Sequence, residues 1–330
     1  MKYTYLGRTG LKVSRLCLGT MNFGPRTDEK EAFAIMDKAL DMGVNFFDTA
    51  NVYGKPNNGF NGHTEEIMGR WFAQGGGRRE KVVLATKVYG DMSDENDGPN
   101  GPRGLSAYKI RRHIEGSLKR LQTDHVELYQ MHHIDRHTPW EEIWGAFEAL
   151  VNQGKAYYIG SSNFGARHLA YAQAMAEKRN FLGLVSEQHK YSLVCRLPEL
   201  EVLPAALELG LGVIPWSPLG GGFLSGNVLN PIAGSERAAD AAKNLTETQH
   251  TQLEAYAALC KELGESESNI ALAWLLANPA VTAPIIGPRT LQQFENTLRA
   301  VNIELSVDVL KKLDEIFPGP GGAAPEAYAW

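Results

Sequence analysis

A regular alternation of short aliphatic runs with longer helical segments constrains the fold of this chain more than any other feature. Short runs of β-branched and aliphatic residues predict buried strands, and apolar residues recurring three or four positions apart predict amphipathic helices. The predicted strands are Val13–Leu18, Asn45–Asp48, Val82–Lys87, Val126–Gln130, Ala156–Gly160, Leu184–Gln188, Gly212–Trp216 and Ala283–Ile286. The predicted helices are Glu29–Met42, Glu65–Ala73, Tyr108–Leu121, Pro139–Gln153, Arg167–Arg179, Glu199–Leu209 and Ile270–Ala277.

This alternation indicates an α/β protein whose strands and helices form a (β/α)8 TIM barrel. An open doubly wound sheet usually has fewer strands and a second domain. The length of 330 residues by itself allows one large domain or two small ones. Because no linker or shift in composition divides the chain, we predict a single barrel domain over residues 1–330.

Both ends of the predicted barrel carry extra chain. The opening residues predict an N-terminal β-hairpin that turns at Thr9 and Gly10 and closes the amino-terminal end of the barrel. Three Gly- and Pro-rich stretches, Tyr53–Gly62, Tyr89–Gly104 and Ser217–Leu245, each follow a predicted strand. We therefore expect long loops at the C-terminal face, where barrel enzymes bind their substrates.

Charge and composition exclude several classes of function. The chain has 33 basic and 38 acidic residues, a formal net charge of −5, and a pI near 6.0. This charge argues against nucleic acid or an anionic membrane as partner, and no apolar segment predicts a signal peptide or a membrane span. The three cysteines are widely spaced and form no CxxC pair, so we expect a cytoplasmic protein without disulfides.

Four side chains at or just beyond strand ends are suited to catalysis. Asp48 ends the run NFFD, Lys87 ends VVLATK, and His132 follows LYQM. Tyr53 lies in the loop five residues beyond Asp48. Because a barrel enzyme collects its catalytic groups from the carboxyl ends of different strands, we expect these four to meet at the barrel mouth.

Their chemistry is coherent as a proton donor beside a site for negative charge. A phenol with a pKa near 10 is a poor acid at neutral pH unless a cation stabilises its phenolate, and Lys87 supplies that cation next to Tyr53. Asp48 pairs with Lys87, and His132 donates a hydrogen bond to the oxygen that gains charge. This set predicts reduction of a carbonyl group by hydride.

The same region allows a different interpretation. His132, His133, Asp135 and His137 are residue types that bind zinc and other divalent ions, which would suit a metal-dependent barrel hydrolase. However, successive strand residues point to opposite faces, so we expect His132 and His133 not to ligate together, and we predict no metal site. The chain also lacks GxGxxG after its first strand, which argues against a Rossmann domain.

Longer strings around these residues resemble the aldo-keto reductase family along nearly the whole chain. The strings are GTMNFG (19–24), FFDTANVYG (46–54), TEEIMG (64–69), ATK (85–87), LYQMHHID (128–135), IGSSNF (159–164), SEQHKYSL (186–193), VIPWSPLGGGFLSG (213–226) and IIGPRTLQQFEN (285–296). The resemblance implies an NADP-dependent oxidoreductase related to reductases of the potassium-channel β-subunit type. It also implies that Tyr53 is the general acid, that Lys87 and Asp48 lower its pKa, and that His132 orients the carbonyl.

By this resemblance NADPH binds extended across the barrel mouth. Its nicotinamide end would contact Thr20, Met21, Asp48, Ser162, Asn163, Gln188 and Trp216, of which Ser162, Asn163 and Gln188 hold the carboxamide and Trp216 stacks on the ring. The run containing Trp216, Ser217, Pro218, Leu219 and Gly221 would offer backbone N–H groups to the pyrophosphate. Gly287 would present the N-terminus of a following helix. Arg289 would bind the 2′-phosphate, which favours NADP over NAD, and Gln293 and Asn296 would reach the adenine.

The resemblance leaves the substrate open among a simple aldehyde, a dicarbonyl and a keto-sugar, including a nucleotide-activated sugar in natural-product biosynthesis. A different class of function is a cofactor-sensing interaction subunit with little turnover, as in potassium-channel β subunits. Those subunits tend to lose the histidine that His132 represents, so its presence here favours an enzyme. We expect a small-molecule carbonyl substrate as the partner, and a homo-oligomer is compatible with the resemblance.

Overall fold

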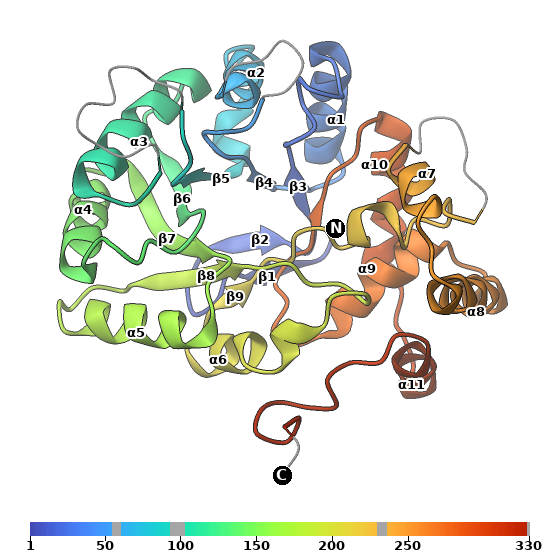
Figure 1. Cartoon of the computed structure of the whole chain (residues 1–330). Helices are drawn as coiled ribbons and strands as arrows, with labels where there is room; N and C mark the ends of the chain where they lie inside the picture. The colour runs from blue at the N-terminus through green and yellow to red at the C-terminus, as the bar shows by residue number, and fades with distance from the viewer. Residues whose placement is uncertain (55–60, 93–102, 230–235, 329–330) are drawn as a thin grey trace.

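The computed structural model describes residues 1–54, 61–92, 103–229 and 236–328, and within them eight parallel strands form one sheet in the order β10-β3-β4-β5-β6-β7-β8-β9. The strands are β3 (Cys17–Gly19), β4 (Phe46–Asp48), β5 (Val83–Val88), β6 (Val126–Met131), β7 (Ala156–Ser162), β8 (Leu184–Gln188), β9 (Gly212–Val213) and β10 (Ile285–Ile286). Figure 1 shows them at the centre of a ring of helices. The predicted (β/α)8 fold is confirmed.

Backbone hydrogen bonds between the two edges of the sheet close the barrel. Val213 N donates to Ala280 O at 3.1 Å, and Thr282 N donates to Val213 O at 2.8 Å. Ile285 N then donates to Pro215 O at 2.8 Å. The predicted strand Gly212–Trp216 is shorter than expected, because Pro215 has no N–H to continue the ladder.

The N-terminal hairpin consists of β1 (Tyr3–Tyr5) and β2 (Lys12–Ser14), which pair antiparallel. The predicted strand Val13–Leu18 is wrong as a single element, because its first half belongs to the hairpin and its second half to β3. Gly7 turns the hairpin toward the barrel with φ +54°, and a Cβ there would lie 2.4 Å from Val185 O. Only glycine fits this approach, and the hairpin covers the amino-terminal end of the barrel.

Six helices follow strands of the barrel and agree with the predicted segments apart from their ends. They are α1 (Glu29–Asp41), α2 (His63–Phe72), α3 (Ala107–Leu121), α4 (Trp140–Asn152), α5 (Ala166–Glu177) and α6 (Val202–Glu208). The largest difference is at α6, which begins at Val202 because residues 197–199 form a separate 3-10 turn, η2. The middle parts of the three predicted loops lie outside the described residues.

Within the described residues the last third of the chain holds five helices. Two of them were expected, one from the predicted segment Ile270–Ala277 and one as the helix that follows Gly287. The five helices are α7 (Glu236–Ala242), α8 (Glu247–Leu263), α9 (Glu267–Ala277), α10 (Leu291–Thr297) and α11 (Val307–Ile316). The 3-10 turn η3 (Gly220–Gly222) precedes α7, and the 3-10 turn η4 (Leu298–Asn302) lies between α10 and α11. The helices gather beside the barrel in Figure 1, with α10 next to α1. A capping box at Thr246 and Gln249 marks the start of α8, and this local signal was available in the sequence.

The core has two layers. The larger apolar cluster fills the space between the sheet and the helices. A smaller cluster lies inside the barrel and includes Leu6 and Val13 of the hairpin together with Phe46, Ala85 and Leu128. The barrel interior is therefore packed at its amino-terminal end, which leaves polar chemistry to the carboxyl ends of the strands.

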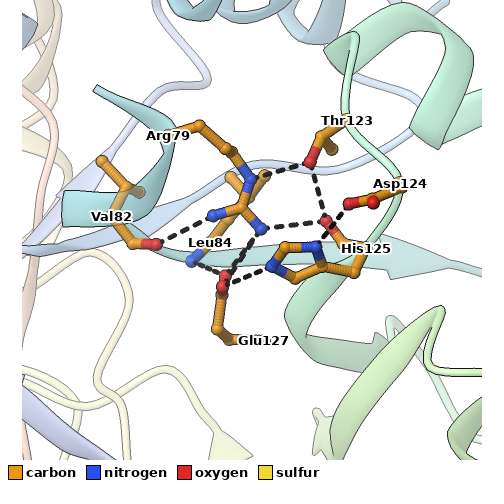
Figure 2. A network of polar contacts seen from close by, with 7 residues as sticks. All are labelled: Arg79, Val82, Leu84, Thr123, Asp124, His125 and Glu127. Atoms are coloured by element: carbon orange, nitrogen blue, oxygen red, sulfur yellow. Dashed lines mark hydrogen bonds and ion pairs between the residues drawn. The ribbon is translucent and has the colours of Figure 1, made fainter. Parts of the chain in front are cut away.

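A network of polar contacts connects β5 and β6 at their amino ends, opposite the carboxyl ends of the strands (Figure 2). Arg79, in the 3-10 turn η1 (Arg79–Lys81), donates to Val82 O, Thr123 Oγ1 and His125 O. The Glu127 carboxylate accepts from Arg79 at 3.0 Å, from Leu84 N at 2.7 Å and from His125 Nε2 at 3.1 Å. This network fixes strand starts and stays apart from the cavity described next.

Candidate active site

Strand alternation places polar side chains inside the barrel above the interior apolar cluster. Side chains two residues apart on a strand share a face, so the residue two positions beyond an interior apolar residue also points inward. The pairs are Phe46 and Asp48 on β4, Ala85 and Lys87 on β5, and Leu128 and Gln130 on β6. The interior is thus apolar toward the amino ends of these strands and polar toward their carboxyl ends.

Lys87 is fully buried and joins two of the predicted catalytic residues. Its Nζ lies 2.5 Å from Asp48 Oδ1 and 3.2 Å from Tyr53 Oη, and it also donates to Thr49 O at 2.9 Å. The cation therefore has three oxygen partners, as a buried charge requires. The predicted contact of Asp48, Lys87 and Tyr53 is present in the structure.

Two glutamines complete the surroundings of Asp48. Gln188 Nε2 donates to Asp48 Oδ2 at 2.8 Å, and Gln130 Nε2 donates to the same oxygen at 2.9 Å. Both carboxylate oxygens are thus engaged, and the carboxylate is fixed toward Lys87. Sequence reasoning assigned Gln188 to the cofactor and missed Gln130, whose position two residues before His132 on an inward face was the available signal.

His132 follows the end of β6 and approaches Tyr53. The two rings are 6.0 Å apart between centroids and nearly perpendicular at 82°. Burial, Lys87 and His133 lower the pKa of His132 to about 2, so the imidazole is neutral at physiological pH. It therefore offers one N–H donor beside the Tyr53 hydroxyl without carrying a charge.

The expectation that His132 and His133 point to opposite faces is wrong. Their rings are stacked, 5.2 Å apart and within 7° of parallel. The alternation rule does not apply to them because β6 ends at Met131. Asp135 accepts hydrogen bonds from Leu105 N and Thr138 Oγ1. Within the described residues, no group of three or more His, Cys, Asp or Glu side chains is arranged to hold a metal ion.

The electrostatics of Tyr53 differ in one respect from the sequence-based expectation. Burial raises the pKa of Tyr53 above its ordinary value, and the attraction of Lys87 offsets this only in part. For Lys87 the balance is the reverse, because burial lowers its pKa but Asp48 and Tyr53 raise it by more. Lys87 is thus a persistent cation that favours the phenolate form of Tyr53 against the effect of burial.

Asn163 connects three parts of the candidate site. Its Nδ2 donates to His132 O at 3.2 Å and to Ser162 Oγ at 3.0 Å, and its Oδ1 accepts from Trp216 Nε1 at 3.1 Å. Its backbone has φ +62°, a left-handed conformation that asparagine tolerates better than most residues. This turn brings together Ser162, Asn163 and Trp216, three of the residues that the sequence predicted for the nicotinamide end of a cofactor.

A cavity of about 910 Å³ opens above these groups and continues to α10. Its lining includes every residue predicted to contact the cofactor, together with Tyr53 and His132. Lys87 lies beneath it and reaches it through Tyr53 and Asp48. The lining residues that the sequence did not identify as site residues include Asn22, Ser225, Asn227, Ser266, Ser268, Asn269 and Thr297.

The predicted helix N-terminus at Gly287 is wrong. The helix that follows, α10, begins at Leu291 with Thr290 as its N-cap, because Thr290 Oγ1 accepts from Gln293 N at 3.2 Å. The Gln293 side chain turns back to accept from Arg289 N at 2.9 Å. Gly287 therefore lines the cavity as part of a loop, and its carbonyl accepts from Asn22 Nδ2 at 2.8 Å.

The predicted run of free backbone donors between Trp216 and Gly221 is also incomplete. Trp216 N donates to His189 O and Gly220 N donates to Ser217 O, both at 2.9 Å. Ser217 adopts φ +52° and Gly221 φ +71°, so both residues lie in the left-handed region. These internal bonds leave fewer N–H groups for an anion than the sequence suggested.

None of the described helices is both long enough and apolar enough to span a membrane.

Comparison with known proteins gives consistent matches. Residues 15–317 match the model described as the aldo/keto reductase family. Over the full length of both chains the sequence is 67% identical to the uncharacterized oxidoreductase YrpG of Bacillus subtilis (strain 168). It is 36% identical, over 96% of each chain, to a probable voltage-gated potassium channel subunit beta of Oryza sativa subsp. japonica. It is also 33% identical to aldo-keto reductase AMT2 of Alternaria alternata, covering 95% of this chain and 90% of that protein.

Proposed function

Since this chain belongs to the aldo/keto reductase family, and is by family an oxidoreductase, we propose that it reduces an aldehyde or ketone to the alcohol with NADPH. The observation that carries the proposal is the contact of Tyr53 Oη with Lys87 Nζ at 3.2 Å, beside the neutral His132. Tyr53 and His132 face the same cavity, so one carbonyl oxygen can contact both.

The residues divide the chemistry between proton transfer and charge stabilisation. A bound reduced nicotinamide supplies a hydride to the carbonyl carbon. Tyr53 donates its proton to the carbonyl oxygen, and Lys87 stabilises the phenolate that remains. His132 donates a hydrogen bond to the same oxygen as negative charge develops on it. Asp48, held by Gln130 and Gln188, keeps the ammonium of Lys87 in place.

The cavity fits a dinucleotide by its volume and its donor set. About 910 Å³ is within the range of cofactor sites. At the Tyr53 end the amide nitrogens of Asn163 and Gln188 already donate within the protein. Their amide oxygens and the Ser162 hydroxyl are the groups that suit the N–H donors of a carboxamide. Arg289 lines the other end, near α10, where its guanidinium suits a 2′-phosphate and would favour NADPH over NADH.

A titration of the purified protein with NADPH, followed by turnover assays at the nicotinamide absorbance band, tests this proposal. We expect tight NADPH binding and oxidation of NADPH with at least one member of a panel of simple aldehydes, dicarbonyls and keto-sugars. If NADPH does not bind, the assignment of the cavity fails.

A second candidate is a cofactor-sensing interaction subunit, because several relatives, at 33 to 36% identity, are named as potassium channel β subunits. Binding of NADPH without turnover of any carbonyl would favour this candidate. The complete set of Asp48, Tyr53, Lys87 and His132 supports the enzyme, since a sensor needs no proton donor.

A further inference from the structure

Glu187 is a buried carboxyl group that the proposed reaction does not use. It lies on β8 between Ser186 and Gln188, with a fully buried side chain. Because Gln188 points to Asp48 in the barrel, Glu187 points to the opposite face, under the turn between β7 and α5. Burying a carboxyl group lowers the stability of the fold unless the group is well hydrogen-bonded. The hydrogen-bond partners of Glu187 therefore indicate its role.

Three donors surround this carboxyl group, and two of them belong to the β7–α5 segment. Ser161 Oγ lies 2.5 Å from Oε2, and Phe164 N donates to Oε1 at 2.9 Å. His189 Nδ1 lies 3.0 Å from Oε1. Burial raises the pKa of Glu187, and the hydrogen bonds from His189, Ser161 and Phe164 N oppose that rise.

The two β7–α5 contacts lie on either side of Ser162 and Asn163. Asn163 has the left-handed φ of +62° and depends on neighbouring anchors to hold it. Asn163 N donates to Gln188 O at 3.0 Å, and Phe164 N donates to Glu187. Adjacent residues of β8 thus hold two successive N–H groups of the turn, one through a carbonyl and one through a carboxyl group.

We propose that Glu187 is a positioning residue that holds the Ser162–Asn163 turn in the conformation required to bind the nicotinamide carboxamide. This inference rests on the proposed NADPH-dependent function. Glu187 does not line the cavity, so it acts through the turn. Removing its carboxyl group leaves Phe164 N without its acceptor and leaves Ser161 Oγ with Ser186 O at 3.3 Å as its acceptor. The turn then loses an anchor on each side of Ser162 and Asn163, and we expect the Asn163 side chain to hold its contacts with His132 O and Trp216 less firmly.

The test compares a probe of the whole cofactor with a probe of its adenosine end. NADPH occupies both ends of the cavity, whereas adenosine 2′,5′-bisphosphate occupies only the end near Arg289. We expect Glu187→Ala to weaken NADPH binding about tenfold and to leave the affinity for the bisphosphate unchanged. Glu187→Gln keeps hydrogen-bonding groups of the same shape, so we expect it to bind NADPH with nearly wild-type affinity.

Glu127 provides a matched control. Its carboxylate also accepts from a backbone N–H, that of Leu84, and from a histidine, but at the opposite end of the strands (Figure 2). Glu127→Ala should lower the melting temperature without changing either affinity. If Glu187→Ala does not fold, Glu187→Asp replaces it, since the shorter side chain cannot reach Ser161 and Phe164 N together, and the same selective loss is expected.

Three results would overturn the inference: unchanged NADPH affinity in Glu187→Ala or its Asp replacement, equal weakening of NADPH and the bisphosphate, or Glu187→Gln as defective as Glu187→Ala. A wild-type protein that binds no NADPH would instead remove the proposed function. The two failures are therefore distinguishable in one set of titrations.

Discussion

At the scale of single residues, burial and a few short contacts determine what each side chain can do. Burial raises the pKa of Tyr53 and lowers the pKa of His132. Burial also lowers the pKa of Lys87, but Asp48 at 2.5 Å, together with Tyr53, raises it by more and keeps the lysine charged. A lysine at a strand end is otherwise an ordinary surface charge. The acid–base chemistry depends on Tyr53, Lys87, Asp48 and His132 together, and none of these residues predicts it alone.

The neutral state of His132 leads to a prediction about pH. With its pKa lowered to about 2, His132 keeps the same protonation state throughout the pH range 5 to 7. We expect His132→Ala to reduce kcat about 10²-fold, since it removes one donor to the developing oxyanion. The ratio of wild-type to variant kcat should stay constant between pH 5 and 7, and a ratio that falls through pH 6.5 would show that His132 titrates there.

The role of Arg289 predicts a difference between the two nicotinamide cofactors. Arg289→Ala should weaken NADPH binding by about 10- to 100-fold, from the loss of charge-assisted hydrogen bonds to the 2′-phosphate, and leave NADH binding unchanged. Arg299→Ala is the control, because this exposed arginine pairs with Glu265 outside the cavity lining. Equal losses for NADPH and NADH would contradict the assignment.

At the scale of elements, the sequence predicted the strands of the barrel and the residues at their carboxyl ends. Alternation along β4 and β5 places Asp48 and Lys87 inside the barrel, and this rule needs only local sequence. The hydrogen bond from Gln188 to Asp48 joins residues 140 positions apart, so no local pattern contains it. The same holds for Glu187, which looks like an ordinary strand residue until β7 is placed beside it.

The N-caps of α8 and α10 provide a matched pair of substitutions. Thr246→Ala and Thr290→Ala each remove a side-chain acceptor from a helix N-terminus, so each should lower the free energy of unfolding by about 1 kcal/mol. Only Thr290 holds the segment that carries Arg289 and Gln293. Denaturant unfolding measures the loss of stability in each variant. Titration with NADPH measures the affinity, which we expect to be weaker for Thr290→Ala alone. Equal affinity in both variants would show that the α10 cap does not shape the site.

At the scale of the whole molecule, the barrel separates stability from chemistry. The apolar interior and the network of Arg79 and Glu127 occupy the amino ends of the strands, and the cavity occupies the carboxyl ends. The cavity is bordered both by barrel strands and by α9 and α10, so a ligand spanning it joins parts of the chain far apart in sequence.

Such a ligand should stabilise the native chain by mass action. At a free NADPH concentration of 100 times Kd, the gain is about 2.7 kcal/mol, which corresponds to a rise in Tm of about 4 °C for a chain of this length. A thermal scan at fixed protein concentration measures the shift. No change in Tm at that concentration would mean that NADPH does not bind the native chain at this cavity.

The measurement that tests the central claim most directly is the rate of carbonyl reduction by Tyr53→Phe alongside its affinity for NADPH. The substitution keeps the ring and removes only the hydroxyl that lies 3.2 Å from Lys87 Nζ. We predict that kcat falls about 10²- to 10⁴-fold while the Kd for NADPH stays within about threefold of wild type. A variant that reduces carbonyls at the wild-type rate would show that Tyr53 is not the proton donor.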